Sequence, residues 1–475
     1  MEWKKRTVEK QEISWLWKSA QAVPAPLLVC LAGNCEEAEA CMRILSEGSD
    51  GSVAVVVLPK EIIPSLEQAL GDLFYEWKQS SEVEGTRLSL TGSSSCADAV
   101  WQVASHFPQW FSAVCVVGGH GDPYEARNLR STPLRAYLPE ETGTVVHGGK
   151  VKADAERLVM GLRISGSEMV ESRRPAPGTK PEEAWRQAFL TERAQDWMLA
   201  QDRKRQWQVT LVKPGVWRID DYFTASCYLV EGTEKAVLVD TGMGEGDLTG
   251  LLAALTRLPV ELAVTHPHGD HMYHAERFSR VYLHENDIAR LQEAPQQFRN
   301  AFSADCQSLP ELCPIGEGSR IELGGGVVLE VAELSGHTPD SVVFIDDAHR
   351  ALYTGDAVGS GYIALMICRE EELEQTVSAY REGLEKFKKH LPRVRDYAWL
   401  GGHAVQENGC DERHQPDHFS GCSHYFNPIR AEVVLDMKAL CEDILSERVT
   451  RAELMAAEEH YCSHGCAGMF FRFLP

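Results

Sequence analysis

The most informative part of the chain is a short histidine-rich segment, Thr265-His266-Pro267-His268-Gly269-Asp270-His271. Three imidazoles and one carboxylate fall within six residues of it, although histidine makes up only 17 of the 475 residues. The segment follows an apolar run at 260–264 that predicts a β-strand, so we expect it on a loop between a strand and a helix. Neutral imidazole and carboxylate are ligands that suit Zn²⁺ and related divalent ions. The segment therefore predicts a metal site.

Four further motifs occur before and after this segment. They are Leu238-Val239-Asp240-Thr241-Gly242, Ser335-Gly336-His337-Thr338-Pro339-Asp340-Ser341, Tyr353-Thr354-Gly355-Asp356 and Gly401-Gly402-His403. In this order, over residues 206–405, the five motifs resemble the signature of the metallo-β-lactamase superfamily. The resemblance implies an αββα metallo-β-lactamase-fold sandwich, and the strand-rich stretch at 321–356 agrees with two sheets covered by helices.

The resemblance also implies which side chains would hold metal. A first ion would be held by His266, His268 and His337, a second by Asp270, His271 and His403, and Asp356 would bridge the two. Asp240 is not expected to bind metal and would instead orient the metal-binding loop through hydrogen bonds, which ligand histidines generally need. Two divalent ions are expected; zinc is the default, and iron or manganese would also fit.

Two such ions, about 3.5–4 Å apart, can hold a hydroxide between them and lower the pKa of the parent water toward neutrality. The reaction implied is hydrolysis of an acyl bond in a small molecule: an ester, a lactone, a thioester or a β-lactam. Asp270 would orient the hydroxide and shuttle its proton. Tyr273 could donate a hydrogen bond to a developing oxyanion, although packing is the simpler role, and His274 is not expected to bind metal.

Three other functions compete with this one. A mononuclear iron dioxygenase acting on a persulfide is disfavoured because all seven ligand positions are kept. A phosphodiesterase or nuclease is opposed by charge, because residues 206–475 hold 23 Lys and Arg against 42 Asp and Glu, and an acidic surface repels phosphate backbones. The third is a serine esterase that uses Ser94. In addition, His268 stands where flavodiiron proteins carry a glutamate, which argues against electron transfer.

Residues 1–205 show a different organisation, in which short apolar runs alternate with longer helical stretches. Strands are predicted at 26–31, 53–58, 87–90 and 113–117, and helices at 36–46, 62–79, 97–105 and 182–204. Strands separated by helices of this length imply parallel βαβ units in a doubly wound sheet. The polar run at 201–205 is the predicted boundary between a first domain, 1–205, and a second domain, 206–475.

A serine-rich turn, Gly92-Ser93-Ser94-Ser95-Cys96, follows the third of these strands and opens a helix. This is the setting of a Gly-x-Ser-x-Gly nucleophile elbow, except that Cys96 replaces the last glycine. With the segments 105–113 and 184–201, the turn resembles esterases of the α/β-hydrolase fold.

The catalytic partners of those esterases do not follow. Residues 136–142 read Ala-Tyr-Leu-Pro-Glu-Glu-Thr where the esterases have a His-Gly turn and then an acidic residue, and Glu182-Glu183 stand where the base histidine is expected. A serine without a base is a weak nucleophile. We therefore expect an α/β-hydrolase-like pseudo-enzyme or accessory domain, with His147 a loop residue rather than a recruited catalytic group.

The end of the chain, from about 406 to 475, is a Cys/His-rich extension. It contains Cys410, His414, His418, Cys422, His424, Cys462, His464 and Cys466. Glycines and proline interrupt any helix in its first part, so the spacing leaves two interpretations open. One is a structural zinc site or a loop lining the active cleft, and the other is reduced thiols with surface imidazoles.

The composition is that of an ordinary globular protein: 44% of the residues are apolar, and 47 Lys and Arg against 70 Asp and Glu give a net charge of −23. No apolar run approaches the roughly 20 residues of a membrane span, and the N-terminus lacks the apolar segment of a signal peptide. Fourteen scattered cysteines are typical of reduced thiols in a cytoplasmic protein. We expect a cytoplasmic protein without nucleic-acid or membrane partners, and the sequence allows a homo-oligomer.

Overall fold

The computed structural model describes residues 1–8, 11–48, 54–59, 73–74, 76–77, 80–108, 110–123, 125–140, 145–147, 150–164, 167, 169–221, 225–293, 301–302, 310–358, 363–403, 429–457 and 460–474. These residues fall into two compact units, 1–206 and 207–474. Most of the helix expected at 62–79 lies outside the described residues, as do Cys410, His414, His418, Cys422 and His424.

Unit 1 is built on an eight-stranded sheet with the order β1-β2-β4-β3-β5-β6-β8-β11. Its strands are β1 (Glu2–Val8), β2 (Gln11–Lys18), β3 (Ala25–Ala32), β4 (Ala54–Pro59), β5 (Val83–Gly92), β6 (Ala113–Val117), β8 (Leu134–Tyr137) and β11 (Val170–Arg173). The strands from β4 to β11 in this order are parallel, and β1 and β2 add an antiparallel hairpin at one edge. The four predicted strands are β3, β4, β5 and β6, so the prediction of a parallel sheet is confirmed.

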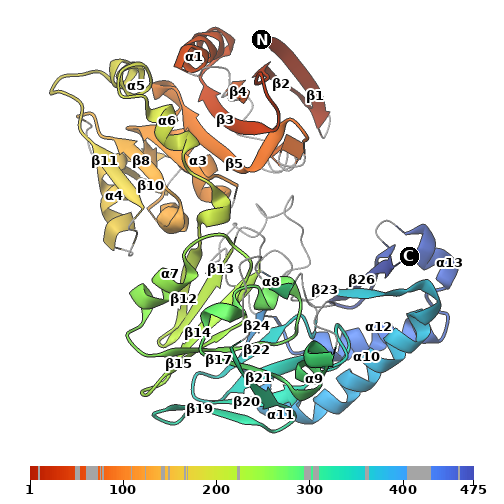
Figure 1. Cartoon of the computed structure of the whole chain (residues 1–475). Helices are drawn as coiled ribbons and strands as arrows, with labels where there is room; N and C mark the ends of the chain where they lie inside the picture. The colour runs from red at the N-terminus through yellow and green to blue at the C-terminus, as the bar shows by residue number, and fades with distance from the viewer. Residues whose placement is uncertain are drawn as a thin grey trace. The chain divides into compact units, whose positions relative to one another are not determined.

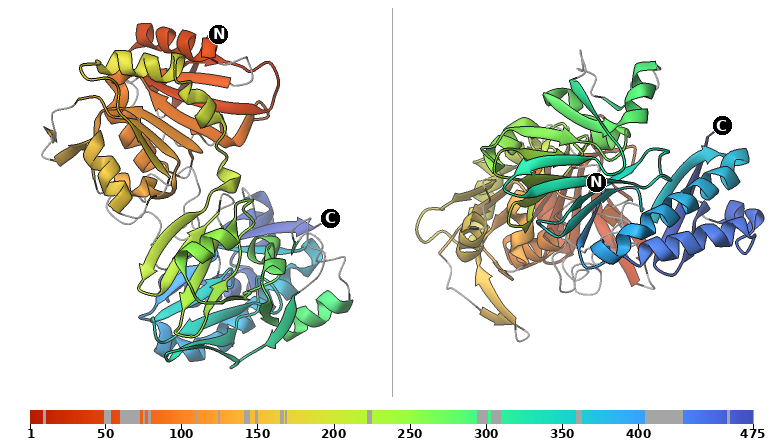
Figure 2. Two further views of the ribbon diagram at one scale, coloured as in Figure 1. Left: turned by 60° about the vertical axis from the view of Figure 1, so that its left-hand side comes forward. Right: turned by 90° about the horizontal axis from the view of Figure 1, so that it is seen from below.

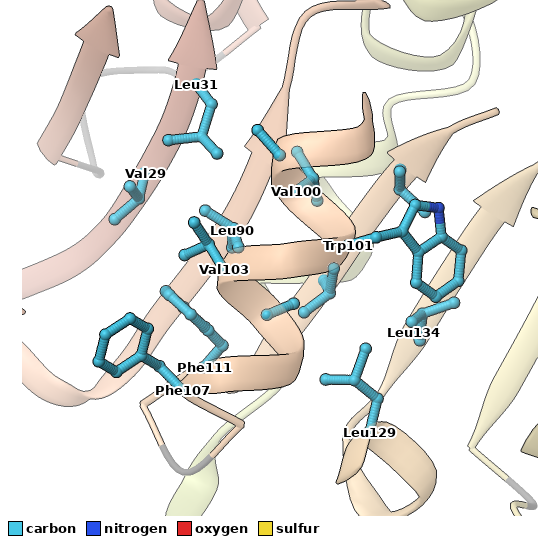
Figure 3. Close-up of a cluster of buried hydrophobic side chains, with 14 of the residues drawn as sticks. Val29, Leu31, Leu90, Val100, Trp101, Val103, Phe107, Phe111, Leu129 and Leu134 are labelled. Carbon is cyan, nitrogen blue, oxygen red and sulfur yellow. The ribbon is translucent and has the colours of Figure 1, made fainter. Parts of the chain in front are cut away.

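Helices cover both faces of this sheet (Figure 1). They are α1 (Cys35–Gly48), α3 (Ala97–His106), α4 (Ala155–Ile164), α5 (Pro181–Leu190) and α6 (Ala194–Leu199). The helices α1 and α5 pack side by side on one face (Figure 2). On the other face, Val100 and Val103 of α3 lie beside Leu31 and Leu90 in a large apolar cluster (Figure 3). A small sheet of β7 (His120–Gly121), β10 (Lys150–Asp154) and β9 (Val145–His147) completes the unit.

Unit 2 contains two sheets that pack face to face around a shared apolar core. The first sheet has the order β12 (Gln208–Lys213), β13 (Val216–Asp220), β14 (Ser226–Glu231), β15 (Ala236–Val239), β16 (Val260–Ala263), β17 (Arg280–His284) and β18 (Glu311–Ile315). The second has the order β19 (Arg320–Gly324), β20 (Val327–Glu333), β21 (Val342–Asp346), β22 (Ala351–Gly355) and β24 (Ala398–Gly401).

Helices cover the outer face of each sheet. On the first sheet lie α7 (Leu248–Leu255) and α9 (Glu285–Glu293), and on the second lie α10 (Leu373–Phe387) and α12 (Val433–Leu445). Two short helices, α8 (Gly269–Met272) and α11 (Leu391–Val394), lie in connections. The order of layers is helix, sheet, sheet, helix, so the predicted αββα sandwich is confirmed.

The described part of the C-terminal extension packs onto this sandwich. A third sheet has the order β23 (Ile363–Arg369), β26 (Ala467–Leu474) and β25 (Cys462–His464), and α13 (Arg451–Ala456) precedes it. The helices α10 and α12 run side by side beneath it (Figure 1). His464 pairs with Asp443 at 2.6 Å, and neither Cys462 nor Cys466 belongs to a potential metal-binding group among the described residues.

Within the described ranges, none of the helices combines the length and the apolar character that crossing a lipid bilayer requires.

Candidate metal centre

The predicted metal-binding residues lie at the carboxyl ends of strands in unit 2. Asp240 follows β15 and the histidine-rich segment follows β16, and these two strands are parallel neighbours with Val239 opposite Ala263. In the second sheet, β22 and β24 are also parallel neighbours, with Gly355 opposite Gly401. This register places Asp356 and His403, which follow those glycines, at one edge of the sandwich.

Three imidazoles from two loops converge in a first group. The Nδ1 atom of His268 lies 3.0 Å from Nε2 of His266 and 2.9 Å from Nε2 of His337. The remaining nitrogens of two of these rings are engaged by the protein: Nδ1 of His266 lies 3.1 Å from the Thr265 hydroxyl, and Nδ1 of His337 donates to the Leu365 carbonyl at 2.7 Å. Because a carbonyl only accepts, the His337 proton sits on Nδ1, and Nε2 of His337 faces His268 with a lone pair.

Burial and crowding keep this first group uncharged. Burial, reinforced by the neighbouring imidazoles, holds the pKa of His266 well below its ordinary value and lowers the pKa of His268 to about 4. Burial also lowers the pKa of His337. Neutral imidazoles are the protonation state that a metal ion needs.

A second group contains Asp270, His271 and His403. Oδ2 of Asp270 lies 3.2 Å from Nε2 of His403 and 3.6 Å from Nε2 of His271. Asp270 and His271 are in the short helix α8, whereas His403 follows β24. The Asp270 side chain is 30% exposed and the His271 side chain is fully buried, so Asp270 is the more accessible of these two ligand candidates.

The carboxylate of Asp356 lies between the two groups. Its Oδ1 is 3.6 Å from Nε2 of His271, and its Oδ2 is 3.6 Å from Nε2 of His337 and 3.4 Å from Nε2 of His403. Gly402 makes room for it, because a Cβ at residue 402 would lie 2.3 Å from Oδ1 of Asp356. The structure thus brings all seven candidate ligands together from four separated stretches of the chain.

The carboxylates of the second group favour positive charge on the neighbouring imidazoles. Burial works against protonation of His271, but the carboxylates of Asp270, Asp356 and Asp240 outweigh it and raise the pKa of His271 to about 9. The same balance, with Asp356 and Asp270 opposing burial, holds the pKa of His403 well above its usual range. Protons on these two rings supply the charge that a bound cation would bring.

Asp240 is the predicted orienting residue. Its Oδ1 accepts from the backbone N–H of Thr265 at 2.8 Å, and its Oδ2 accepts from the Thr265 hydroxyl at 2.8 Å and from Nδ1 of His271 at 2.9 Å. Because a carboxylate only accepts, Nδ1 of His271 keeps a proton, so Nε2 is the nitrogen that can give up its proton to bind a cation. In this way a side chain that is not a ligand candidate can determine which nitrogen of a candidate ligand stays protonated.

Two buried atoms of these residues have no hydrogen-bond partner in the described part of the chain, which fits the binding of a divalent cation. Nε2 of His271 and Oδ1 of Asp356 are buried and have no hydrogen-bond partner among the described residues. A buried polar atom without a partner costs about 1–3 kcal/mol. Imidazole nitrogen and carboxylate oxygen are also the donor types that zinc takes in proteins. A cation within these groups would satisfy both atoms.

Two other predicted residues of the histidine-rich region lie outside the groups. Tyr273 is half-buried with its ring 5.0 Å from that of His274, which agrees with packing. His274 is buried, and its Nε2 lies 2.8 Å from the Gly244 carbonyl while its N–H donates to Thr241. It ties α8 to the loop after β15.

The serine-rich turn of unit 1 has no base in the described structure. Ser94 is half-buried at the start of a 3₁₀ turn after β5, and no imidazole is recorded within hydrogen-bonding distance of it among the described residues. The neighbouring Ser95 hydroxyl donates to Glu37 at 2.9 Å, and the N–H of Gly33 donates to the same carboxylate at 2.6 Å. The expectation that His147 is a loop residue is wrong, because it ends β9, where its backbone pairs with Lys150.

A separate cluster of ligand-type side chains was not found by the sequence analysis. His284, Asp287 and Asp340 offer ligand-type atoms close together, beside the loop that carries His337. The guanidinium of Arg290 pairs with Asp287 and lies 2.5 Å from Oδ2 of Asp340. Asn286 also donates to Asp340 at 2.8 Å. A positive side chain thus already stands between these carboxylates, and the cluster serves to hold the turn after His337 against α9.

Comparison with known proteins agrees with this geometry. Residues 220–288 and 314–404 match the model of a family described as the metallo-beta-lactamase superfamily. The acyl-coenzyme A thioesterase MBLAC2 of Gallus gallus is 27% identical over 163 residues, 29% of this chain and 58% of MBLAC2. The hydroxyacylglutathione hydrolase GloC of Haemophilus influenzae is 26% identical over 206 residues, 41% of this chain and 92% of GloC.

The similarities cover only part of this chain and, for the first relatives, only part of their own length. The chain spans 58% of MBLAC2 and 66% of the first curated relative it matches. Among solved structures, the metallo-beta-lactamase GOB-18 from Elizabethkingia meningoseptica has a TM-score of 0.36 and 16% identity, covering 53% of this chain and 94% of that one.

Proposed function

The C-terminal half of this chain contains a metallo-β-lactamase superfamily domain, and we propose that the protein is a dinuclear metal-dependent hydrolase that cleaves an acyl bond. One observation carries the proposal. Five imidazoles and two carboxylates converge in two groups around Asp356, and buried atoms of His271 and Asp356 lack partners. The two buried atoms that lack hydrogen-bond partners among the described residues cost free energy in the folded protein, and a bound cation would remove that cost by coordinating them.

The proposed metal is zinc, because the donors are imidazole nitrogens and carboxylate oxygens. His266, His268 and His337 would hold one ion, Asp270, His271 and His403 the other, and Asp356 would contact both. Divalent ions held there would polarise an acyl carbonyl oxygen and lower the pKa of a bound water molecule.

The side chains of the protein supply positioning and proton transfer. Asp240 keeps the His271 proton on Nδ1, and the Leu365 carbonyl does the same for His337. Asp270 is the most exposed of the three acidic side chains at the site, at 30% against 8% for Asp356 and 3% for Asp240. Its carboxylate oxygens are therefore proposed to orient the attacking water and to hold the proton that this water gives up.

Acyl thioesters come first among the proposed substrates. Two curated relatives are named for acyl hydrolysis, one as an acyl-coenzyme A thioesterase and one as a hydroxyacylglutathione hydrolase. Esters, lactones and β-lactams contain the same electrophilic carbonyl and follow as further candidates.

A hydrolysis panel of acyl-coenzyme A, acylglutathione, aryl ester, lactone and nitrocefin tests this function directly. We expect zinc-loaded protein to cleave at least one acyl thioester. His271→Ala should lower kcat/KM by more than about a hundredfold, because removing a ligand should cost more than removing a hydrogen-bond partner of a ligand, which costs about ten- to a hundredfold. His349→Ala is the matched control, because this imidazole pairs with Asp346 away from both ligand groups. Equal loss in both variants would count against the assigned site.

Unit 1 is proposed to be an α/β-hydrolase-like accessory domain without serine catalysis. Glu37, a carboxylate that contacts the serine turn, accepts hydrogen bonds from the N–H of Gly33 and the hydroxyl of Ser95. A fluorophosphonate probe should therefore leave Ser94 unlabelled in the full chain. Labelling that Ser94→Ala abolishes would instead establish a second, serine-based activity.

A further inference from the structure

Helix α10 lies directly against two loops of the metal centre. Tyr380 and Gly383 are one turn apart on this helix, so they share the face that the helix turns toward the loop containing His337. Tyr380 is fully buried. Its hydroxyl donates to the carbonyl oxygen of Ala357 at 2.9 Å, and Ala357 directly follows Asp356. One side chain of α10 thus fixes the backbone next to the central carboxylate.

The same face leaves no space between the helix and the loop before His337. A Cβ at Gly336 would lie 1.9 Å from Cδ2 of Tyr380, so the tyrosine ring rests on the Gly336 backbone. One turn later, a Cβ at Gly383 would lie 2.1 Å from the carbonyl oxygen of Ser335. The helix backbone at Gly383 therefore reaches the loop backbone with nothing in between.

We propose that Tyr380 and Gly383 are positioning residues, which set the places of His337 and Asp356 through the backbone of their loops. This inference rests on the proposed function, because it concerns the same metal centre. The residues of α10 alternate apolar and charged side chains at helical spacing, a pattern that by itself indicates only an amphipathic helix.

These contacts affect metal binding because a metal site tolerates only small displacements of its ligands. The His337 ring has one outer hydrogen bond, to the Leu365 carbonyl, and its Nε2 must remain near Nδ1 of His268. Metal ligands must be held within roughly 0.5 Å of their productive positions. A loop that moves by that distance loses the alignment of His337, although the fold around it persists.

The first test compares two tyrosine-to-phenylalanine substitutions that remove one buried hydroxyl each. Tyr380→Phe removes the hydrogen bond to Ala357 and keeps the ring on Gly336. Tyr353→Phe is the control, because Tyr353 is equally buried in the same unit but its hydroxyl points to Asp346 at 3.4 Å. Zinc affinity is measured on the stripped full-length chain by competition with a chromogenic chelator. We expect Tyr380→Phe to lose about ten- to a hundredfold in affinity for at least one ion, and Tyr353→Phe less than about twofold.

The second test uses alanine, which ordinarily stabilises a helix where glycine stood. Gly383→Ala should lower zinc affinity by about tenfold or more, because its methyl group pushes the Ser335 carbonyl away. Gly161→Ala in α4 is the control, because a Cβ there meets nothing within 4 Å, and its zinc affinity should equal that of the wild type. Far-ultraviolet circular dichroism of each metal-free variant checks the fold, and the visible spectrum of bound Co²⁺ reports the ligand geometry.

The outcomes separate the two proposals. Wild-type protein that binds no zinc overturns the proposed function and this inference together. Wild-type protein that binds zinc, with Tyr380→Phe and Gly383→Ala at the same affinity and with the same Co²⁺ spectrum, overturns the inference alone. Loss of affinity in these two folded variants, with both controls unchanged, supports it.

Discussion

Asp240 connects the two halves of the histidine-rich loop without being a ligand candidate itself. It receives three hydrogen bonds, two from Thr265 and one from His271, and it is 2% exposed. Its backbone has a φ of 61°, a left-handed conformation that costs free energy in a non-glycine residue. The surrounding hydrogen bonds offset that cost and fix the loop.

Replacing Asp240 by Asn should weaken the metal centre more than the fold. Asparagine offers one acceptor and one donor where three donors converge, so the Nδ1 proton of His271 loses its fixed place. We expect Asp240→Asn to lower zinc affinity by about ten- to a hundredfold, measured by chelator competition. Asp247→Asn, which alters the exposed N-cap of α7, is the matched control and should leave zinc affinity unchanged.

Asp221 gives the metal-free protein a specific pH dependence. Burial raises the pKa of this carboxyl from 3.8 to about 7, although it accepts backbone hydrogen bonds from Met243 and Ala225. Between those values the folded state binds the proton more tightly than the unfolded chain, so this contribution to stability is present at low pH and is lost as the pH rises through 7.

Asp221→Asn removes that titration. Relative to wild type, the variant's free energy of unfolding in urea should increase by roughly 1–3 kcal/mol between pH 5 and pH 8. Both proteins are measured with chelator present, because a bound cation would add its own pH dependence. A difference that stays constant with pH would show that the Asp221 carboxyl keeps its ordinary pKa.

The ligand candidates could be predicted because their spacing is short and their residue types are uncommon. The histidine-rich segment holds four of them, and glycines mark the turns before His337, Asp356 and His403. The contacts of Leu365 and Tyr380 could not be predicted. The first uses a backbone carbonyl, which every residue carries, and the second depends on how α10 packs against loops far away in sequence.

Strand β26 joins the C-terminal extension to the metal centre. Its residues 468–474 pair with β23, and Leu365 of β23 accepts the hydrogen bond from His337. Alternate residues of β26 face the apolar core under α12, so Phe471 is buried and Phe470 is half-buried. The extension is therefore part of the same packed core as α10.

Phe471→Ala should lower the free energy of unfolding of unit 2 by about 3–5 kcal/mol, because it leaves a cavity in that core. Phe470→Ala removes the same atoms from the half-buried face of the strand and should cost clearly less. Urea unfolding followed by tryptophan fluorescence measures both. An equal, small effect of the two substitutions would mean that the extension contributes little to the core.

The element predictions were most accurate where apolar runs are strong. The strands from β3 to β6 formed as expected, whereas the helix expected over 182–204 is broken into α5, α6 and a 3₁₀ turn. Arg193 takes a left-handed conformation, with φ 51°, between α5 and α6. The hairpin of β1 and β2 was missed because charged residues interrupt its apolar pattern.

At the scale of the whole molecule, the two units have separate cores and only unit 2 carries the candidate ligands. A ligand that binds only the folded state stabilises the unit that holds it. Removing zinc should therefore lower the melting temperature of the unit 2 transition by several degrees, and the unit 1 transition should keep its temperature. Differential scanning calorimetry of the stripped and reloaded chain measures both, and equal shifts of the two transitions would contradict this assignment.

The central claim is that seven side chains of unit 2 hold two cations that make acyl hydrolysis possible. The most direct measurement is a zinc titration of the stripped full-length chain, with bound metal and thioester hydrolysis followed in the same samples. We expect two equivalents of zinc to bind and the activity to rise with them, and we expect His271→Ala to lose one equivalent together with the activity. Fully loaded protein that cleaves no acyl bond, or a wild-type chain that saturates at one equivalent, would contradict it.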